Sequence, residues 1–100
     1  MQVIRHIVLF SFHNEVSEER RAAFDAAARN LAALIPAIAR SSAGPALALQ
    51  AGPIDYVLEL DFGDAVRFRE YKEHAAHQAF IEQHVRPCVA QTTRAQLTLD

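Results

Sequence analysis

The sequence predicts an α+β domain in which helices cover one face of a four-stranded antiparallel sheet. Segments with apolar residues at every second position, the period of a strand, alternate with segments in which they recur every three or four positions, the period of a helix. Their order is strand, helix, strand, strand, helix, helix, strand. For that order, helices grouped on one face of an antiparallel sheet are the economical packing.

Length and composition indicate one domain with a thin core. A chain of 100 residues fits a single domain over residues 1–100, and a domain of this size buries only about 60–65% of its extended surface. Alanine supplies 19 of the hydrophobic residues, so large apolar side chains are few and a partner subunit would help. The net charge of −2, with both signs mixed along the chain, favours neither nucleic acid nor a membrane surface as partner.

The cysteine count and the first residues favour a cytoplasmic protein. Cys88 stands alone, so it cannot form a disulfide within the chain. Residues 1–10 carry Arg5 and His6 within an apolar run and lack a small-residue cleavage site, so no signal peptide is expected. No apolar run approaches the roughly 20 residues that a membrane span needs.

Residues 3–12 are predicted to form a strand that is largely apolar on both faces. A strand that must be covered on both sides predicts helices over one face and another layer, such as a second subunit, over the other. One face carries Ile4, His6, Val8, Phe10 and Phe12, and the other carries Val3, Arg5, Ile7, Leu9 and Ser11.

Residues 18–35 are predicted to form the first helix. Ser17 is suited to be its N-cap, and Glu18 and Glu19 stand in the first turn, where the helix dipole favours negative charge. Pro36 ends the helix because proline has no backbone N–H. The residues of its buried stripe are Phe24, Ala27, Ala28, Leu31 and Ile35.

Two further strands are expected in the middle of the chain. Residues 37–52 mix short alternation with glycine and proline, which indicates an interrupted or edge strand. Residues 54–62 form a clearer strand with one apolar and one mixed face. The apolar face carries Tyr56, Leu58, Leu60 and Phe62, and the mixed face carries Val57, Glu59 and Asp61.

The last part of the chain is predicted to form two helices and a strand. Asp64 is suited to cap a helix over residues 65–72 that turns Phe68 and Tyr71 inward. Residues 77–90 predict a second helix, in which Pro87 removes a backbone donor. Residues 94–100 alternate as a final strand. The second helix would bury Phe80, Ile81, Val85 and either Cys88 or Val89.

The stretch EYKEHAAHQAF places Tyr71, His74 and His77 at three-residue steps. Histidine is a proton acceptor whose pKa lies near working pH. On one unbroken helix the three side chains turn away from a common point, so they cannot act together unless the helix breaks between them. Each also has a structural interpretation, His6 and His77 as hydrogen-bonded residues and Tyr71 as a packed aromatic.

No metal or cofactor is predicted. Two histidines without a third ligand at a defined spacing do not define a metal site, and we assign His13, His74 and His84 to the surface. Cys88 has no basic partner near it in sequence. The three glycines are too scattered for a phosphate-binding loop.

Three segments, RHIVLFSF, DYVLELDF and YKEHAAHQAFIEQHVRP, together resemble the stress-responsive A/B barrel (Dabb) family, in family order and over nearly the whole chain. The resemblance implies a ferredoxin-like fold, with two chains packed sheet against sheet as a dimeric α/β barrel. It therefore implies a homodimer and accounts for a first strand that is apolar on both faces. Two departures are Ala75, where the family commonly has proline, and the region between residues 41 and 53.

The resemblance also implies a break at HAAH, which would turn Tyr71 and His77 toward one cavity while His74 caps or turns outward. Plant polyketide cyclases of the family close a poly-β-keto chain by an aldol step with a histidine base and a tyrosine in this motif. By position, His77 would be the base, Tyr71 would hydrogen-bond the carbonyl oxygen, and His6 would orient the substrate or His77. A small hydrophobic or aromatic ligand would contact Phe10, Phe24, Tyr56 and Phe80.

Three functions follow as hypotheses: a cofactor-free lyase or cyclase acting on a carbonyl carbon acid, a module that binds a small ligand without transforming it, and a stress-related structural protein. The enzyme hypothesis predicts a closed pocket of several hundred Å³ that holds His77 and Tyr71. Antibiotic-biosynthesis-type monooxygenases share the implied fold, but nothing in the sequence selects them.

Overall fold

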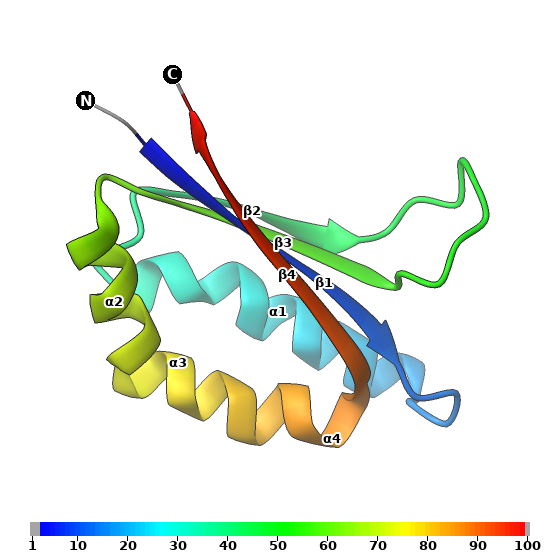
Figure 1. The fold of residues 1–100 in the computed structure, drawn as a ribbon. Helices are drawn as coiled ribbons and strands as arrows, with labels where there is room; N and C mark the ends of the chain where they lie inside the picture. The colour runs from blue at the N-terminus through cyan, green and yellow to red at the C-terminus, as the bar shows by residue number, and fades with distance from the viewer. Residues whose placement is uncertain (1–2, 100) are drawn as a thin grey trace.

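A four-stranded antiparallel sheet forms one layer of the protein and the helices form the other (Figure 1). The computed structural model describes residues 3–99. The elements in chain order are β1 (Val3–Phe12), α1 (Glu18–Leu34), β2 (Arg40–Pro45), β3 (Tyr56–Phe62), α2 (Ala65–Glu73), α3 (Ala75–Phe80), the π-helical turn η1 (Ile81–Val85), α4 (Arg86–Cys88) and β4 (Val89–Leu99). The predicted fold class and element order are confirmed.

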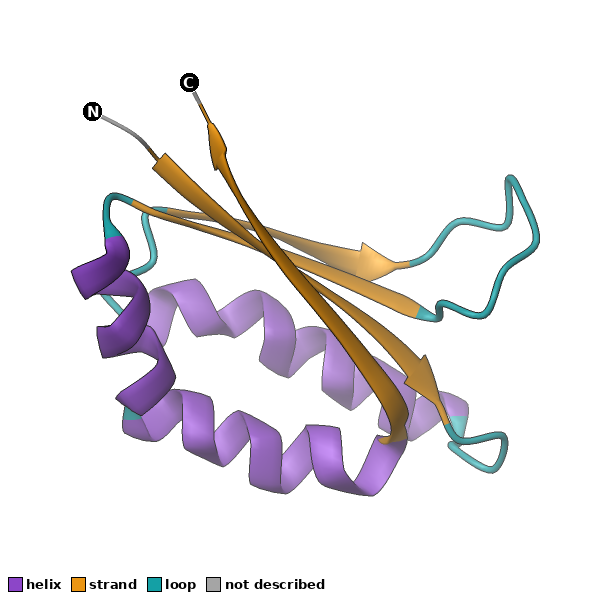
Figure 2. Cartoon of the chain, in the orientation of Figure 1, coloured by secondary structure: helices purple, strands orange, loops and turns teal. Residues whose placement is uncertain are grey.

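The strand order is β2-β3-β1-β4, so β1 and β3 lie at the centre of the sheet. His6 stands opposite Leu60 on β3 and opposite Gln96 on β4. Phe10 stands opposite Tyr56. The helices all lie on the same side of this sheet (Figure 2). They cover the face that carries the buried apolar side chains of β1 and β3, which are Val8, Phe10, Phe12, Tyr56, Leu58, Leu60 and Phe62.

Helix α1 begins and ends as the sequence predicts. The Ser17 hydroxyl accepts a hydrogen bond from the backbone N–H of Arg20 at 3.1 Å, and the helix ends at Leu34, before Pro36. Phe24 of this helix is fully buried and packs edge-on against Phe10 and Tyr56 of the sheet. This aromatic cluster joins α1 to the two central strands.

The predicted break between α2 and α3 is confirmed and lies at His74. Its backbone has φ −68° and ψ 139°, an extended conformation that ends α2. The His74 Nδ1 atom then accepts a hydrogen bond from the backbone N–H of Ala76 at 3.0 Å and caps α3. The break therefore forms although Ala75 occupies the position of the family's proline.

The boundaries predicted for the C-terminal region are partly wrong. The second helix begins at Ala75 and passes through the π-helical turn, and β4 begins at Val89 instead of residue 94. Pro87 has no backbone N–H to donate to the carbonyl oxygen of Gln83. The Arg20 guanidinium donates a hydrogen bond to that oxygen instead, at 3.3 Å. Residues 89–93 show no apolar alternation because this edge strand is mostly exposed.

The sheet face away from the helices, here called the outer sheet face, lacks a covering layer within the described chain (Figure 2). Apolar and polar side chains share this face. Arg5 and Asp61 form a cross-strand pair on this face, with Nε–Oδ1 and Nη2–Oδ2 distances of 2.9 and 3.0 Å. Leu97 is 44% exposed there. Its half-buried apolar residues are Val3, Ile7, Leu9, Val57 and Leu99.

Candidate active site

A cavity of about 40 Å³ lies between the helix-facing side of the sheet and the helical layer. We call it the histidine cavity because it is the hollow that contains His6, Tyr71 and His77 together. Three larger hollows, of about 250, 320 and 730 Å³, contain none of these three residues. The histidine cavity is lined by His6, Val8, Phe10, Leu58, Tyr71, His77, Phe80, Ile81, Val85, Thr92 and Arg94.

His77 enters the cavity from the first turns of α3. Its Nδ1 atom lies 3.1 Å from the backbone carbonyl oxygen of Lys72. A carbonyl oxygen only accepts, so Nδ1 carries the proton of the neutral ring and Nε2 keeps its lone pair. Burial lowers the pKa of His77, and the charges of Lys72 and Arg94 lower it further, while the hydrogen bond to Lys72 opposes them. The ring is therefore a neutral base near pH 7.

His6 lies deeper, on β1, and is 5% exposed. The side-chain Nε2 of Gln96 donates to its Nδ1 atom at 2.8 Å. With Nδ1 accepting, the neutral ring of His6 carries its proton on Nε2, the tautomer opposite to that of His77. Burial, with the charges of Arg94, His77 and Lys72, lowers the pKa of His6 to about 4. His6 is thus a neutral hydrogen-bond donor.

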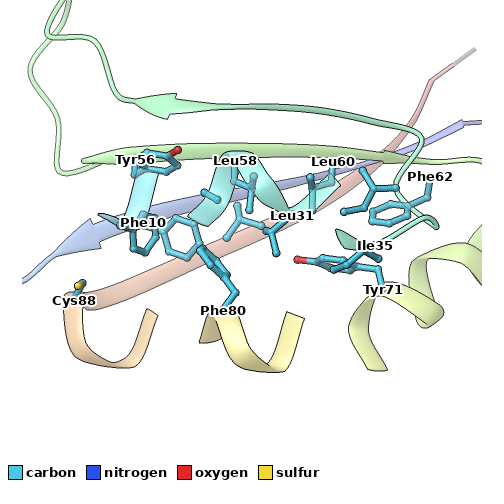
Figure 3. Packing of buried hydrophobic residues seen from close by; sticks show 14 of the residues in the cluster. Phe10, Leu31, Ile35, Tyr56, Leu58, Leu60, Phe62, Tyr71, Phe80 and Cys88 are labelled. Atoms are coloured by element: carbon cyan, nitrogen blue, oxygen red, sulfur yellow. The ribbon is translucent and has the colours of Figure 1, made fainter. Parts of the chain in front are cut away.

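Tyr71 connects the two histidines. Its ring centroid lies 4.3 Å from that of His77 and 6.0 Å from that of His6. Burial raises its pKa, so the hydroxyl stays protonated and can donate. Figure 3 shows this hydroxyl directed from α2 toward the side on which Phe80 lies. Within residues 3–99 the hydroxyl has no hydrogen-bond partner, so it is available to a ligand.

Of the four residues expected to contact a ligand, Phe10 and Phe80 line the cavity and Tyr56 and Phe24 do not. Tyr56 stands opposite Phe10, four positions along the sheet from His6 and about 13 Å away at strand spacing. Its hydroxyl donates to the Asp25 carboxylate, which also accepts from Arg29 at 2.8 Å. Phe24 is fully buried in the aromatic cluster. Both residues belong to the hydrophobic core.

The expectation that His84 is a surface residue holds only in part. The side chain is half-buried, and its Nδ1 atom is buried with no hydrogen-bond partner among residues 3–99. Burial and the charge of Arg20 lower its pKa. His13 is exposed as expected, and His74 is the half-buried cap of α3.

Sequence reasoning missed Arg94, Thr92 and Gln96, which come from β4. Thr92 precedes the predicted start of the last strand at residue 94. Arg94 and Gln96 lie within that predicted strand, but the register that brings them to β1 is set only in the folded chain. The cavity is also far smaller than the several hundred Å³ expected for an enzyme pocket, and the aromatic residues Phe10, Phe80 and Tyr71 that line it are themselves buried.

Together these groups provide a neutral base, His77, beside two protonated donors, Tyr71 and His6. No carboxylate lines the cavity among residues 3–99. Within the same residues, no group of three or more histidine, cysteine or acidic side chains is placed to hold a metal ion. None of the helices described there is long and apolar enough to cross a bilayer.

Comparison with solved structures confirms the ferredoxin-like fold. A dimeric ferredoxin-like protein of unknown function from Thermobifida fusca is 30% identical, with a TM-score of 0.89 over 98% of this chain and 92% of its own. The hydroxynitrile lyase of Passiflora edulis is 17% identical, with a TM-score of 0.85 over 98% and 94% of the two chains. SnoaB, a cofactor-independent oxygenase from Streptomyces nogalater, is 15% identical, with a TM-score of 0.71 over 97% and 92%.

At 17% and 15% identity, the likeness to the lyase and the oxygenase concerns the fold alone. No curated protein matches the sequence. Residues 4–97, which run from β1 into β4, match the family described as Stress Responsive A/B Barrel Domain. The match spans every element of the sheet and the break at His74, and the chain therefore belongs to the stress-responsive A/B barrel domain family.

Proposed function

We propose that this protein is a homodimeric, cofactor-free enzyme that removes a proton from a carbon next to a carbonyl group, as a lyase or a cyclase does. The observation that carries the proposal is the position of His77. Its Nδ1–H is held by the Lys72 carbonyl, its Nε2 lone pair is available, and its ring lies 4.3 Å from that of Tyr71. A general base oriented by a second hydrogen bond and placed beside a protonated donor is suited to enolate chemistry.

In the proposed step, His77 Nε2 takes the proton from the substrate carbon. The electron pair of the C–H bond forms a carbon–carbon double bond, and the carbonyl electron pair moves onto oxygen. The hydroxyl of Tyr71 and the Nε2–H of His6 donate to that oxygen as it becomes negative. The enolate then attacks a second carbonyl, whose oxygen takes the proton back from the His77 imidazolium. Alternatively it expels a leaving group, which takes that proton. A base and an oxyanion donor each contribute on the order of 10²-fold or more.

The cavity volume limits what enters. About 40 Å³ holds roughly three water molecules, so only the carbonyl end of a substrate fits, and the rest extends past the more exposed side chains of Ile81, Val85, Thr92 and Arg94. Ile81 and Val85 belong to the π-helical turn, and such turns occur frequently at functional sites. This supports an entrance between η1 and β4.

A second copy of the chain is the proposed cover for the outer sheet face. The apolar residues there, with Leu97 44% exposed, gain stability from burial at about 25 cal/mol per Å². The similar Thermobifida fusca protein is dimeric. The Arg5–Asp61 pair lies within this face, where a bidentate ion pair favours one register of the two sheets over others.

Hydrogen–deuterium exchange tests the chemistry without knowledge of the natural substrate. The full-length protein is incubated in D₂O with pyruvate or with its uncharged analogue pyruvamide, and loss of the methyl proton signal is followed by NMR. We expect catalysed exchange that falls at least 100-fold in His77→Gln and at least 10-fold in Tyr71→Phe. His13→Gln, which alters an exposed histidine, serves as the control and should not change the rate. Equal exchange by wild type and His77→Gln, or none with either compound, overturns the proposal.

The apolar side of the cavity also favours a second candidate, binding of a small ligand without chemistry. Val8, Phe10, Leu58 and Phe80 form that side. In this case His77→Ala keeps its affinity for the ligand, and the wild type shows no exchange. A large loss of affinity in His77→Ala argues against it.

A further inference from the structure

We infer that the ligand of the histidine cavity is a small keto acid whose carboxylate is bound by Arg94. The inference rests on the proposed function for the reacting end of the molecule and adds a charge requirement at its other end. It comes from the position of Arg94, from its lack of an acidic partner, and from the size of the cavity.

Arg94 is placed by the register of β4 against β1. It stands opposite Val8, two positions from Gln96, and therefore on the same helix-facing side as His6. His6 and Arg94 are therefore diagonal neighbours across β1 and β4. Diagonal neighbours lie about 7–8 Å apart, a distance that a long side chain can span. Arg94 lines the cavity together with His6, Tyr71 and His77, yet it is exposed whereas His6 and Tyr71 are buried. Its guanidinium thus belongs to the outer end of the cavity.

Arg94 forms no ion pair within residues 3–99. The described arginines that do so are Arg5, Arg21, Arg29, Arg67 and Arg86. No aspartate or glutamate lines the cavity among those residues. The charge of Arg94 acts on His6, Tyr71 and His77, and that of Lys72 acts on both histidines. The histidine cavity is therefore positive and lacks a counter-ion of its own, which favours an anionic ligand.

A planar carboxylate fits this arrangement best. Guanidinium binds carboxylates through two parallel hydrogen bonds, and about 40 Å³ leaves room for few further atoms. With the carboxylate at Arg94, the carbonyl end of a short keto acid points inward, toward the donors Tyr71 and His6. The carbon that loses the proton then lies on the side of His77. The apolar side of the cavity receives the uncharged part of the molecule.

The test compares two probes of nearly equal shape, pyruvate and pyruvamide, by NMR titration of the full-length protein. We expect wild type to bind pyruvate at least 10-fold more tightly than pyruvamide. Arg94→Gln should bind pyruvate about 10-fold more weakly and pyruvamide as before, whereas Arg94→Lys should retain part of the preference. Arg40→Gln makes the same charge change on β2, at the opposite edge of the sheet, and should leave both affinities unchanged.

Equal affinity for the two probes, no binding of pyruvate, or equal losses in Arg94→Gln and Arg40→Gln overturns the inference. Displacement of pyruvate by an equal concentration of inorganic phosphate also overturns it, because the site would then bind anions in general.

The deuterium exchange experiment separates this inference from the proposed function. If wild type and Arg94→Gln exchange both probes at equal rates, the proposed proton abstraction is supported and the requirement for a charged ligand is overturned. If pyruvate binds in an Arg94-dependent way but does not exchange, the proposed ligand class is supported and the proposed proton abstraction is overturned.

Discussion

The rings of His77 and Tyr71 have centroids 4.3 Å apart, and the helical segment between the two residues is interrupted at His74. The extended backbone of His74 turns α3 away from the direction of α2 (Figure 1). Without this break, residues six positions apart would point to different sides of one helix. The break is therefore the local feature that assembles the proposed base and donor.

Replacing Ala75 with proline should stabilise the protein by about 0.4–1 kcal/mol. Ala75 is the first residue of α3, where proline is favoured because its missing N–H has no helical partner. The conformation of His74, φ −68° and ψ 139°, is the one that a residue before proline prefers. Thermal unfolding measures the change. Ala76→Pro is the matched control and should destabilise, because the Ala76 N–H donates to His74 Nδ1; a stabilising Ala76→Pro would contradict this account of the cap.

Tyr56→Phe and Tyr71→Phe should show opposite phenotypes. Loss of the Tyr56 hydroxyl removes its hydrogen bond to Asp25 and should reduce the free energy of unfolding by about 1–3 kcal/mol, since the partner is charged. The exchange rate should not change, because Tyr56 does not line the cavity. Tyr71→Phe should slow exchange at least 10-fold with little effect on stability. Denaturant unfolding and NMR exchange measure the two effects, and a Tyr56→Phe variant with slow exchange would return Tyr56 to the active site.

The stability of the fold should fall as the pH drops from about 6.5 to about 4. The pKa of His6 is lowered from 6.5 to about 4 by burial, so in this interval the unfolded chain binds a proton that the folded chain does not. Stability therefore rises with pH across the window, by on the order of 3 kcal/mol at most, and is constant above it for this group. Urea unfolding at successive pH values measures the slope.

His77 and His84 have lowered pKa values and add to the same trend. Asp25 and Asp61 have pKa values below 3.8. The stability that they contribute is therefore lost at pH values below this window, where they become protonated. His6→Asn cannot take up the proton, and its slope between pH 4 and 6.5 should be smaller than that of wild type. An unchanged slope would show that His6 is not buried in its neutral form.

The proposed exchange activity should fall at acidic pH as His77 becomes protonated. Its pKa lies below 6.5 because of burial and the charges of Lys72 and Arg94. Removing one positive charge in Arg94→Gln should therefore raise the pKa of His77 and move the acid limb to higher pH. NMR titration of the His77 ring measures this pKa directly. A shift of equal size in Arg40→Gln would attribute the effect to net charge instead.

Leu97→Glu should dissociate the proposed homodimer. Leu97 is 44% exposed on the outer sheet face and stands opposite Arg5, whose guanidinium already binds Asp61 through two hydrogen bonds. A second carboxylate buried there would compete with Asp61 for Arg5, and a buried charge that is not fully paired costs several kcal/mol. Leu34→Glu is the matched control, because Leu34 is 52% exposed but lies on α1 in the helical layer. Sedimentation at low concentration should show a dimer for wild type and Leu34→Glu and a monomer for Leu97→Glu. A monomeric wild type removes the basis for the dimer.

The sequence by itself determined the features that arise from neighbours along the chain. Alternation of side chains in residues 3–12 and 56–62 predicted the two central strands, because side-chain direction in a strand has a period of two. Ser17 and Asp64 predicted helix starts, because a cap bonds the backbone three residues away. The family pattern at HAAH predicted that Tyr71 and His77 face one cavity.

Only the tertiary structure decided which distant residues complete the cavity. Gln96 is 90 positions from His6, and the hydrogen bond that sets the His6 tautomer exists only once β4 pairs with β1 in one register. The same register brings Arg94 to the cavity, and no pattern within β4 indicates it. Tyr56 lies outside the histidine cavity, and sequence could not show this, because the face of the sheet on which Tyr56 lies is predictable but its distance along the sheet from His6 is not. Local periodicity determines the face of the sheet on which a side chain lies. Its neighbours across the sheet depend on the pairing of strands that are far apart in the chain.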